Sequence, residues 1–183
     1  MDKYPIPYVK TFEFTKIIGL DNIEFGKYVI IDDFVLIYAQ EKMKIGNYVH
    51  IANFTSITGS KKVILEDFSA ISQGCRLLTA TDDFKDWGFG NSTIDNQFRN
   101  LKSGTIEIGK FCIVGANSVI LPNVKIGEGA TVGANSVVTK NLDPWGIYIG
   151  NKKVGERNMK SVMENYNKLI KKSEHERIGN LFK

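Results

Sequence analysis

The chain carries a hydrophobic pattern that repeats every six residues. Six consecutive hexads open on an aliphatic residue, at Ile108, Val114, Ile120, Ile126, Val132 and Val138. Their fifth places hold small or medium residues, namely Cys112, Ser118, Val124, Ala130, Ser136 and Leu142. The same frame recurs upstream, from Ile45 and again from Leu65, and a weaker set begins at Phe25. Self-similarity at a fixed period is the sequence signature of a repeat architecture.

Short strands joined by turns at this period predict a coil with three flat faces. The first aliphatic side chain of each hexad points inward, the fifth fits beside it, and Gly, Asn or Asp accommodates the turn. Successive coils pair through parallel backbone hydrogen bonds, which stacks the aliphatic residues into one core. The pattern therefore predicts an all-β protein, a parallel β-helix. Cys75 and Cys112 both fall at fifth positions, where we expect small buried hydrophobic residues without a redox role.

Two segments leave the period. Residues 83–107 have no hexad frame, and a long loop that contains Trp87 and Phe98 is more typical of a functional loop than of disorder. From Glu156, apolar residues at helical spacing predict an amphipathic C-terminal helix, packed on the coils or on a neighbouring subunit. We therefore expect a β-helix domain over 1–150 with a loop insertion at 83–107, and a helical extension over 151–183.

Composition narrows the classes of protein. A length of 183 residues suits one domain, and 43% hydrophobic with 24% charged residues is typical of a soluble protein. The net charge of +4 lies mostly in the last third, which favours phosphate-like ligands over nucleic acid. No apolar run is long enough to span a bilayer, and the first residues lack the apolar core of a signal peptide. We expect a cytoplasmic protein without membrane insertion.

These hexads, together with the segments Val137-Val138-Thr139-Lys140 and Pro144-Trp145-Gly146-Ile147-Tyr148-Ile149-Gly150-Asn151, resemble the hexapeptide-repeat acyltransferases. The resemblance covers Ile45 to Lys153. It is strongest to the sugar acetyltransferase branch, which contains galactoside and O-antigen O-acetyltransferases and N-acyltransferases of nucleotide-linked amino sugars. It implies a left-handed β-helix, a homotrimer, acetyl-CoA as donor and active sites between neighbouring subunits.

Acyl transfer needs a base for the acceptor proton and donors for the oxyanion. Histidine is the usual base, and the chain has two. His175 lies in a charged run, where a solvated surface role is expected. His50 closes the Ile45 hexad at a turn, so its side chain should point away from the core. We predict that His50 is the base, with a plain surface role as the alternative.

The corner before the long loop departs from the galactoside acetyltransferases, which place a catalytic His there. Here the corner reads Thr79-Ala80-Thr81-Asp82-Asp83. In this it resembles the amino-sugar N-acyltransferases, which have such a Thr-Asp-Asp corner together with a Val-His-Ile-Ala-like motif. We therefore predict an intersubunit pair in which Asp82 or Asp83 orients His50 and favours its charged form. Turn capping is the alternative role of either aspartate.

The resemblance also implies ligand contacts. Asn53 matches an Asn that contacts the acceptor, Arg99 could meet a diphosphate or carboxylate, and Trp87 or Phe98 could stack on a ring. A purely structural lid is the alternative role of this loop. The predicted coenzyme A contacts are Ala116, Ala134, Thr139, Lys140, Lys152, Lys153 and Arg157. The family's Gly-Asn-Pro-Ala-Lys segment reads Gly150-Asn151-Lys152-Lys153, which changes the local backbone but adds positive charge suited to phosphates.

Two acyl acceptors fit these residues. We favour the amino group of a nucleotide-linked amino-deoxy sugar used in surface-polysaccharide (lipopolysaccharide) synthesis. The alternative is a hydroxyl of a glycoside, O-antigen or capsule glycan. A carbonic anhydrase of this fold needs three His ligands, so no metal is expected. A non-enzymatic scaffold would predict neither the corner His nor the aromatic loop. The sugar, the position acylated and the acyl length stay open.

Overall fold

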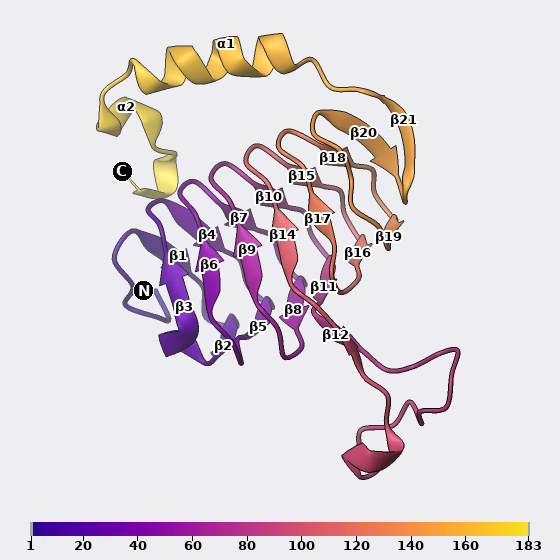
Figure 1. The fold of residues 1–183 in the computed structure, drawn as a ribbon. Coiled ribbons are helices and arrows are strands. Elements are labelled where there is room, and N and C mark those ends of the chain that lie inside the picture. Colours follow the sequence, from indigo (N-terminus) through magenta and orange to yellow (C-terminus); the bar gives the residue numbers. More distant parts are fainter. Residues whose placement is uncertain (1, 183) are drawn as a thin grey trace.

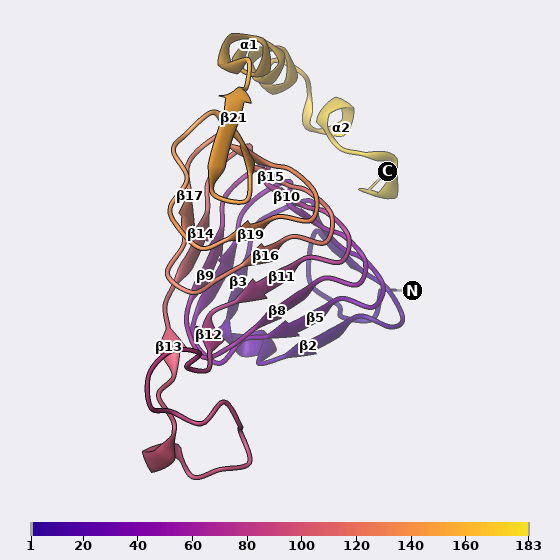
Figure 2. The same cartoon turned by 90° about the vertical axis from the view of Figure 1, so that its right-hand side faces the viewer.

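The protein is a three-sided prism of stacked coils, seen from the side in Figure 1 and along its axis in Figure 2; the computed structural model describes residues 2–182. One side, sheet A, contains β1 (Val9–Thr11), β4 (Val29–Ile31), β7 (His50–Ile51), β10 (Ala70–Ile71), β15 (Ile113–Val114), β18 (Thr131–Val132), β20 (Gly146–Ile149) and β21 (Lys152–Glu156).

The other two sides are also parallel sheets. Sheet B contains β2 (Lys16–Ile18), β5 (Leu36–Tyr38), β8 (Ser56–Thr58), β11 (Arg76–Leu78), β16 (Val119–Ile120) and β19 (Val137–Val138). Sheet C contains β3 (Ile23–Phe25), β6 (Met43–Ile45), β9 (Val63–Leu65), β14 (Ile106–Ile108) and β17 (Lys125–Ile126). A short 3-10 helix, η1 (Leu20–Asn22), precedes β3.

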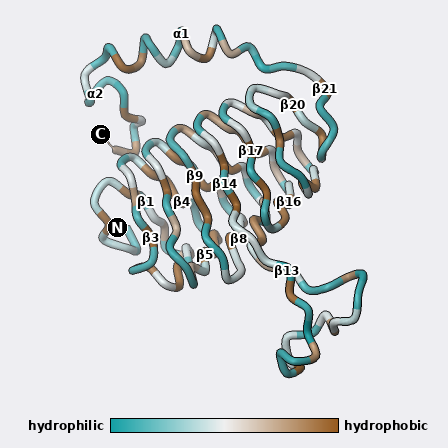
Figure 3. Tube along the Cα trace, viewed as in Figure 1, coloured by the Kyte–Doolittle hydropathy of each residue, from teal (hydrophilic) through white to brown (hydrophobic). Residues whose placement is uncertain are grey.

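The strand register places the aliphatic hexad positions above one another. Ile31 pairs with Ile51 and Ile51 with Ile71, and all three side chains are buried. Hydrophobic residues accordingly recur along the stacked strands in Figure 3. This confirms the predicted parallel β-helix. Cys112 is buried as predicted, and burial raises the pKa of its thiol to about 12, so it stays protonated.

The turns only partly follow the expectation that Gly, Asn or Asp would fill them: Asn117, Asn123 and Asn135 do adopt left-handed backbone, but other turns hold aromatic residues instead. At the corner between sheets C and A, aromatic residues adopt left-handed backbone with φ between 56° and 62°, at Tyr8, Tyr28, Tyr48, Phe68, Phe111 and Trp145. This conformation is uncommon for bulky residues and costs free energy. Stacking offsets the cost, because the ring centroids of Tyr48 and Phe68 lie 4.7 Å apart. A second stack, Phe14–Phe34–Phe54, occupies the corner between sheets A and B.

The C-terminal segment covers the first aromatic corner. The predicted helix is present as α1 (Met159–Ile170), followed by α2 (Glu174–Arg177) and η3 (Asn180–Phe182), and Figure 1 shows α1 running along the prism. Tyr166 contacts Phe68 and Phe111 edge-on, at 5.5 and 5.2 Å between centroids. Residues 152–156 were predicted as part of the helical extension; they instead form β21, antiparallel to β20.

The loop insertion leaves the prism between β12 (Ala80–Thr81) and β13 (Lys102–Ser103), which pair in an antiparallel ladder at its base. The loop projects well away from the coils and contains η2 (Asn96–Phe98) (Figure 1). The predicted bounds of 83–107 extend too far, because Ile106–Ile108 form β14 and pair with β9 and β17.

Candidate functional site

His50 begins β7 on the outer face of sheet A and has a carboxylate partner in its own chain. Its Nε2 lies 3.0 Å from Oδ2 of Asp32, which follows β4 on the adjacent coil. The side chain of His50 is 48% exposed and that of Asp32 is 29% exposed. The sequence prediction missed Asp32. The signal that could have found it is the length of one coil in residues. Ile30 lies one coil before His50 and pairs with it in the ladder of β4 and β7, and Asp32 follows Ile30 by two residues.

Two surface hollows flank this pair. One of about 160 Å³ is lined by Tyr28, Ile30, Tyr48, Val49, His50, Gly179 and Phe182. The other, of about 330 Å³, is lined by Phe12, Asp32, Asp33 and Asn53. Asp32 thus contacts the predicted base His50 and also lines one hollow together with the predicted acceptor-binding Asn53.

Asp83 closes the base of the projecting loop. Its Oδ1 accepts hydrogen bonds from the backbone N–H groups of Lys85 and Asp86, both at 3.0 Å, and its Oδ2 accepts one from Asn100 Nδ2 at 2.8 Å. The backbone N–H groups hold the pKa of Asp83 well below its usual range. Both oxygens are therefore engaged, and this agrees with the turn-capping alternative.

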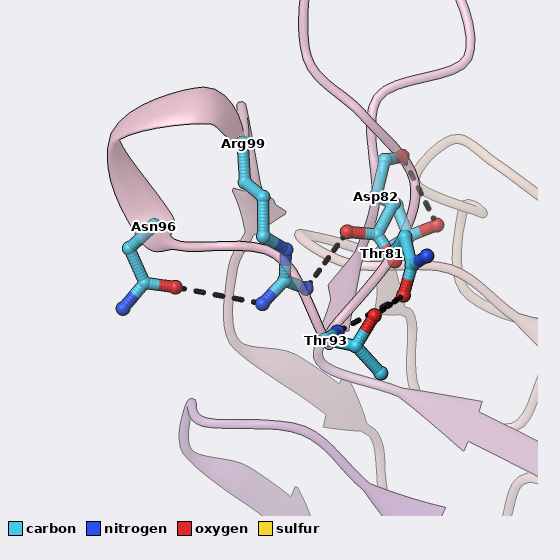
Figure 4. A network of polar contacts seen from close by, with 6 residues as sticks. Thr81, Asp82, Thr93, Asn96 and Arg99 are labelled. Carbon is cyan, nitrogen blue, oxygen red and sulfur yellow. Dashed lines mark hydrogen bonds and ion pairs between the residues drawn. The ribbon is translucent and has the colours of Figure 1, made fainter.

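Asp82 contacts Arg99 across the loop, as Figure 4 shows. Arg99 Nη2 donates to Asp82 Oδ1 at 2.9 Å, and its Nη1 reaches Asn96 Oδ1 at 3.5 Å. Arg99 is 12% exposed and Asp82 31% exposed. Within residues 2–182, no hydrogen bond uses Oδ2 of Asp82. Arg99 is thus held by Asp82, while Asp82 keeps one oxygen for another partner.

The aromatic residues of the loop face solvent. Trp87 is 64% exposed and Phe98 50% exposed, and the described part of the chain places no aromatic partner against either ring. The Phe89 N–H donates to the Phe98 carbonyl oxygen, which fixes the loop backbone around them. Both rings are positioned so that an external ligand or a second subunit could contact them.

The loop cluster and the His50 cluster lie on different sides of the prism. The loop leaves from the corner between sheets B and C, opposite sheet A, which carries His50 (Figure 2). No hydrogen bond or ion pair joins Asp82 or Asp83 to His50 within the described chain. The predicted pairing of His50 with one of these aspartates is therefore not made inside a single chain, where Asp32 takes that place.

Most residues predicted to contact coenzyme A are exposed, whereas Lys153 has a partner in its own chain. Ala134, Thr139, Lys140 and Lys152 are exposed on the last coils, with Ala116 partly exposed on an earlier coil at the same corner as Ala134. Lys153 pairs with Glu156 at 2.5 Å, a hydrogen bond that raises the pKa of Lys153.

Arg157 contacts the backbone of the aromatic corner. Its Nη1 donates to the backbone oxygens of Phe111 and Gly129, at 2.6 and 3.0 Å. It therefore fastens the C-terminal extension to this corner, and its contact with a coenzyme A phosphate stays a prediction.

Two features are absent from residues 2–182. No group of three or more His, Cys, Asp or Glu side chains is arranged there to hold a metal ion. No helix in this part of the chain has the length and apolar character needed to cross a membrane.

Comparison with known proteins gives three findings. Residues 105–140 match the bacterial transferase hexapeptide (six repeats) family. The chain is 35% identical over 117 residues to the dTDP-4-amino-4,6-dideoxy-D-glucose acyltransferase of Escherichia coli, which covers 63% of this chain and 61% of that enzyme. The match thus spans less than two thirds of the curated relative's length.

The structural likeness extends further. The chain resembles AntD, an N-acyltransferase from Bacillus cereus in complex with dTDP and 3-hydroxybutyryl-CoA, with a TM-score of 0.84 and 37% identity over 89% of this chain and 87% of AntD. A variant of AntD in complex with dTDP-4-amino-4,6-dideoxyglucose and coenzyme A gives a TM-score of 0.85 at 37% identity, over 90% and 88% of the two chains. Other solved AntD variants replace a serine or an aspartate that lie ten positions apart in that protein.

Proposed function

The chain belongs to the hexapeptide-repeat transferases, and on that premise we propose that it transfers an acyl group from coenzyme A to the amino group of a dTDP-linked 4-amino-4,6-dideoxy sugar. The observation that carries this proposal is the likeness to AntD at 37% identity over 89% of the chain. A hydroxyl acceptor is less well supported, since the Escherichia coli relative and AntD are both named for amino-sugar or N-acyl chemistry.

The spacing of two polar residues supports the same acceptor. Ser72 and Asp82 form the only Ser–Asp pair in this chain with the ten-residue separation of the positions replaced in AntD. Asp82 has an oxygen that Arg99 does not use, whereas both oxygens of Asp83 are engaged in the loop. Of the two aspartates predicted at this corner, we therefore assign the role toward the substrate amine to Asp82, and the loop-closing role to Asp83.

The complete site is proposed to need two copies of the chain. Ser72 follows β10 in sheet A, one coil beyond Asn53 and beside the His50 cluster, whereas Asp82 lies at the opposite corner. Because these two patches lie on different sides of one subunit, they can meet only if neighbouring subunits bring them together. In a closed ring, the loop patch of each subunit meets the sheet A patch of the next, so every site is complete. We propose a homotrimer in which the loop of one subunit reaches sheet A of the next.

The proposed chemistry is direct attack of the neutral amine on the thioester carbonyl. Asp82 accepts a hydrogen bond from the amine and holds its nitrogen at the carbonyl carbon. His50 accepts the proton that the nitrogen loses as the bond forms, which is the role of a general base near neutral pH. Asn53 lies in the hollow beside Asp32 and is proposed to contact the sugar.

The last coils are proposed to bind the donor. Lys140 and Lys152 are exposed, and the described residues give neither an ion-pair partner, so both can approach the coenzyme A phosphates. Ala116, Ala134 and Thr139 would contact the rest of the donor through their backbone, as the family resemblance implies. Lys153 has Glu156 as a competing partner, so its contribution to phosphate binding should be smaller. Arg99, bound to Asp82, would reach the diphosphate only through its remaining N–H groups.

The acceptor class suggests a place in surface-polysaccharide synthesis, such as that of lipopolysaccharide. Acylated amino-deoxy sugars activated by a nucleotide are building blocks for such polymers, and the reaction would then take place in the cytoplasm, where nucleotide sugars are made.

Turnover with defined substrates tests this proposal. The purified chain is incubated with acetyl-CoA or 3-hydroxybutyryl-CoA and with dTDP-4-amino-4,6-dideoxyglucose, the corresponding dTDP-6-deoxy sugar with a hydroxyl group, and UDP-linked amino sugars. Thiol release and the product mass are measured. We expect release with the dTDP-amino sugar and a product heavier by one acyl group. Release only with hydroxyl acceptors would make the protein an O-acyltransferase and overturn the proposal.

A further inference from the structure

We propose that Asp32 is the positioning residue for His50, holding the imidazole in the orientation and tautomer that let it accept the acceptor's proton. This inference rests on the proposed function, and it assigns to Asp32 a part that neither the sequence pattern nor the family resemblance indicated. It begins from the 3.0 Å contact between His50 Nε2 and Asp32 Oδ2.

The backbone fixes this contact. Ile30 pairs with His50 and Ile31 with Ile51 in the parallel ladder between β4 and β7, and Ile31 and Ile51 are fully buried in the core. A shift in register by one residue would expose both, so the position of His50 relative to the residue after Ile31 is held by the core itself. Asp32 is that residue. A catalytic group built on strands is more precisely placed than one built on a loop.

The contact also determines which ring nitrogen carries the proton. An ionised carboxylate can only accept a hydrogen bond, so the neutral imidazole must place its proton on Nε2 to donate to Asp32. The lone pair then lies on Nδ1. Among residues 2–182, no hydrogen bond engages Nδ1, and the side chain is 48% exposed. The ring is thus oriented with its basic nitrogen available to a substrate.

Atoms and charge balance in the reaction step. The substrate nitrogen attacks the thioester carbonyl carbon, a C–N bond forms, and the proton that the nitrogen loses passes to His50 Nδ1. The resulting imidazolium is stabilised by the Asp32 carboxylate, which stays ionised. When the C–S bond breaks, the sulfur of coenzyme A takes the electron pair, and the proton passes from Nδ1 to it. The base is thereby restored without any further reactant.

Asp33 provides a matched comparison in the same turn. Its Oδ1 accepts a hydrogen bond from the backbone N–H of Phe14 at 2.8 Å, and it makes no contact with His50. Asp33 lines the same hollow as Asp32 and Asn53. Replacing either aspartate by asparagine removes the same charge from the same turn, but only the change at Asp32 alters the partner of the imidazole.

A merely structural ion pair is the competing explanation. Partly exposed pairs of this kind add little to stability, and losing one leaves the chemistry unchanged. The groups that face His50 from other elements are few. Asp32 follows β4, and the adjoining hollow adds Tyr28 and Tyr48 from the aromatic corner, with Gly179 and Phe182 from the C-terminal segment. Asp32 is thus the one carboxylate in contact with the imidazole within the described chain.

The test compares Asp32→Asn, Asp32→Glu and Asp33→Asn with the unsubstituted full-length protein. The measurements are kcat and KM for both substrates. For Asp32→Asn we expect kcat to fall on the order of 10²-fold with KM nearly unchanged. Asp32→Glu should recover part of the rate, and Asp33→Asn should lose less kcat than Asp32→Asn, because it leaves the contact with the imidazole intact.

The other outcomes separate this inference from the proposed function. Full activity of Asp32→Asn, in a preparation whose thermal unfolding matches the unsubstituted protein, would overturn this inference and leave the proposed function standing. Equal losses in Asp32→Asn and Asp33→Asn would also overturn it, since the charge of the turn and not the contact with His50 would then matter. Failure of the unsubstituted protein to acylate any amino sugar would instead overturn the proposed function itself.

Discussion

Two of the protein's pairs between a carboxylate and a nitrogen base or cation, Asp32–His50 and Asp82–Arg99, are built very differently. Asp32 contacts His50 on adjacent strands of the coil, where the buried core fixes the register. Asp82 contacts Arg99 across a projecting loop, whose backbone is closed by Asp83 and by the short ladder of β12 and β13. The geometry of the His50–Asp32 pair, the coil cluster, is set by the fold. The geometry of the Asp82–Arg99 pair, the loop cluster, depends on a few local hydrogen bonds.

The difference suggests a division of labour. A proton acceptor must keep one orientation through many turnovers, which suits the rigid coil. A loop that leaves the prism suits the binding and enclosure of an acceptor. Substitutions on the coil should therefore alter the chemical step, and substitutions in the loop should alter substrate capture as well.

Replacement of Asp82 should give the largest single effect. Asp82→Asn removes the charge proposed to hold the substrate amine and releases Arg99, so kcat/KM should fall on the order of 10²- to 10³-fold. Steady-state kinetics with the dTDP-amino sugar measures this. Asp86→Asn is the matched control, because Asp86 is an exposed loop carboxylate paired with Lys102 at 3.4 Å. Equal loss in the two variants would show that loop charge alone is important.

Replacement of Asp83 should act on the loop and only indirectly on catalysis. Asp83→Asn loses the acceptor for two backbone N–H groups, so the loop should open, limited proteolysis within 84–101 should quicken, and kcat/KM should fall about tenfold. The unfolding midpoint of the coil should not move. Unchanged proteolysis would mean that other contacts close the loop.

The lowered pKa of Asp83 predicts how closure of the loop depends on pH. Its folded pKa is depressed, so its contribution to loop closure is fully present above its ordinary value near 4 and is lost only as the pH falls through the lower folded value. Proteolysis by an acid-active protease should therefore stay slow from neutral pH to about pH 4 and quicken only below that. The Asp83→Asn loop should be open throughout this range. An unsubstituted loop that opens already between pH 5 and 6 would contradict this account.

The smallest expected effect on activity comes from the covered aromatic corner. Tyr166→Ala removes a ring that packs on Phe68 and Phe111, so the free energy of unfolding should fall by about 1–2 kcal/mol. Activity at 25 °C should stay within about twofold. Met159→Ala, at an exposed position of the same helix, is the control and should change the unfolding midpoint little. A large loss of activity in Tyr166→Ala would connect the C-terminal segment with the site.

The coil was predictable from the sequence because its core repeats. Aliphatic residues every six positions specify inward-facing strands. The left-handed aromatic turns were not predictable from propensity, because a ring such as Phe68 is tolerated there only by stacking on rings of neighbouring coils. β21 was missed because a short polar strand such as Lys152–Glu156 carries no alternating pattern.

The site was predictable only in part. His50 could be singled out because histidine is rare in this chain, but its partner Asp32 comes from another coil and becomes evident only with the strand register. The adjacent Asp82 and Asp83 carry the same side chain, and the structure distinguishes them by their hydrogen bonds. The charge of Arg157 was evident in the sequence, but its hydrogen bonds to two backbone carbonyls were not, because they join segments that are distant in the chain.

Subunit complementation is the most direct test of the claim that the coil cluster and the loop cluster of two copies form one site. His50→Ala and Asp82→Asn chains carrying different tags are co-expressed, and assemblies that contain both are purified in two steps. Each variant alone should be nearly inactive. A trimeric ring that contains both variants combines two intact clusters at one of its sites, so mixed assemblies should recover about a third of the unsubstituted activity. Mixed assemblies no more active than the separate variants would contradict the shared site.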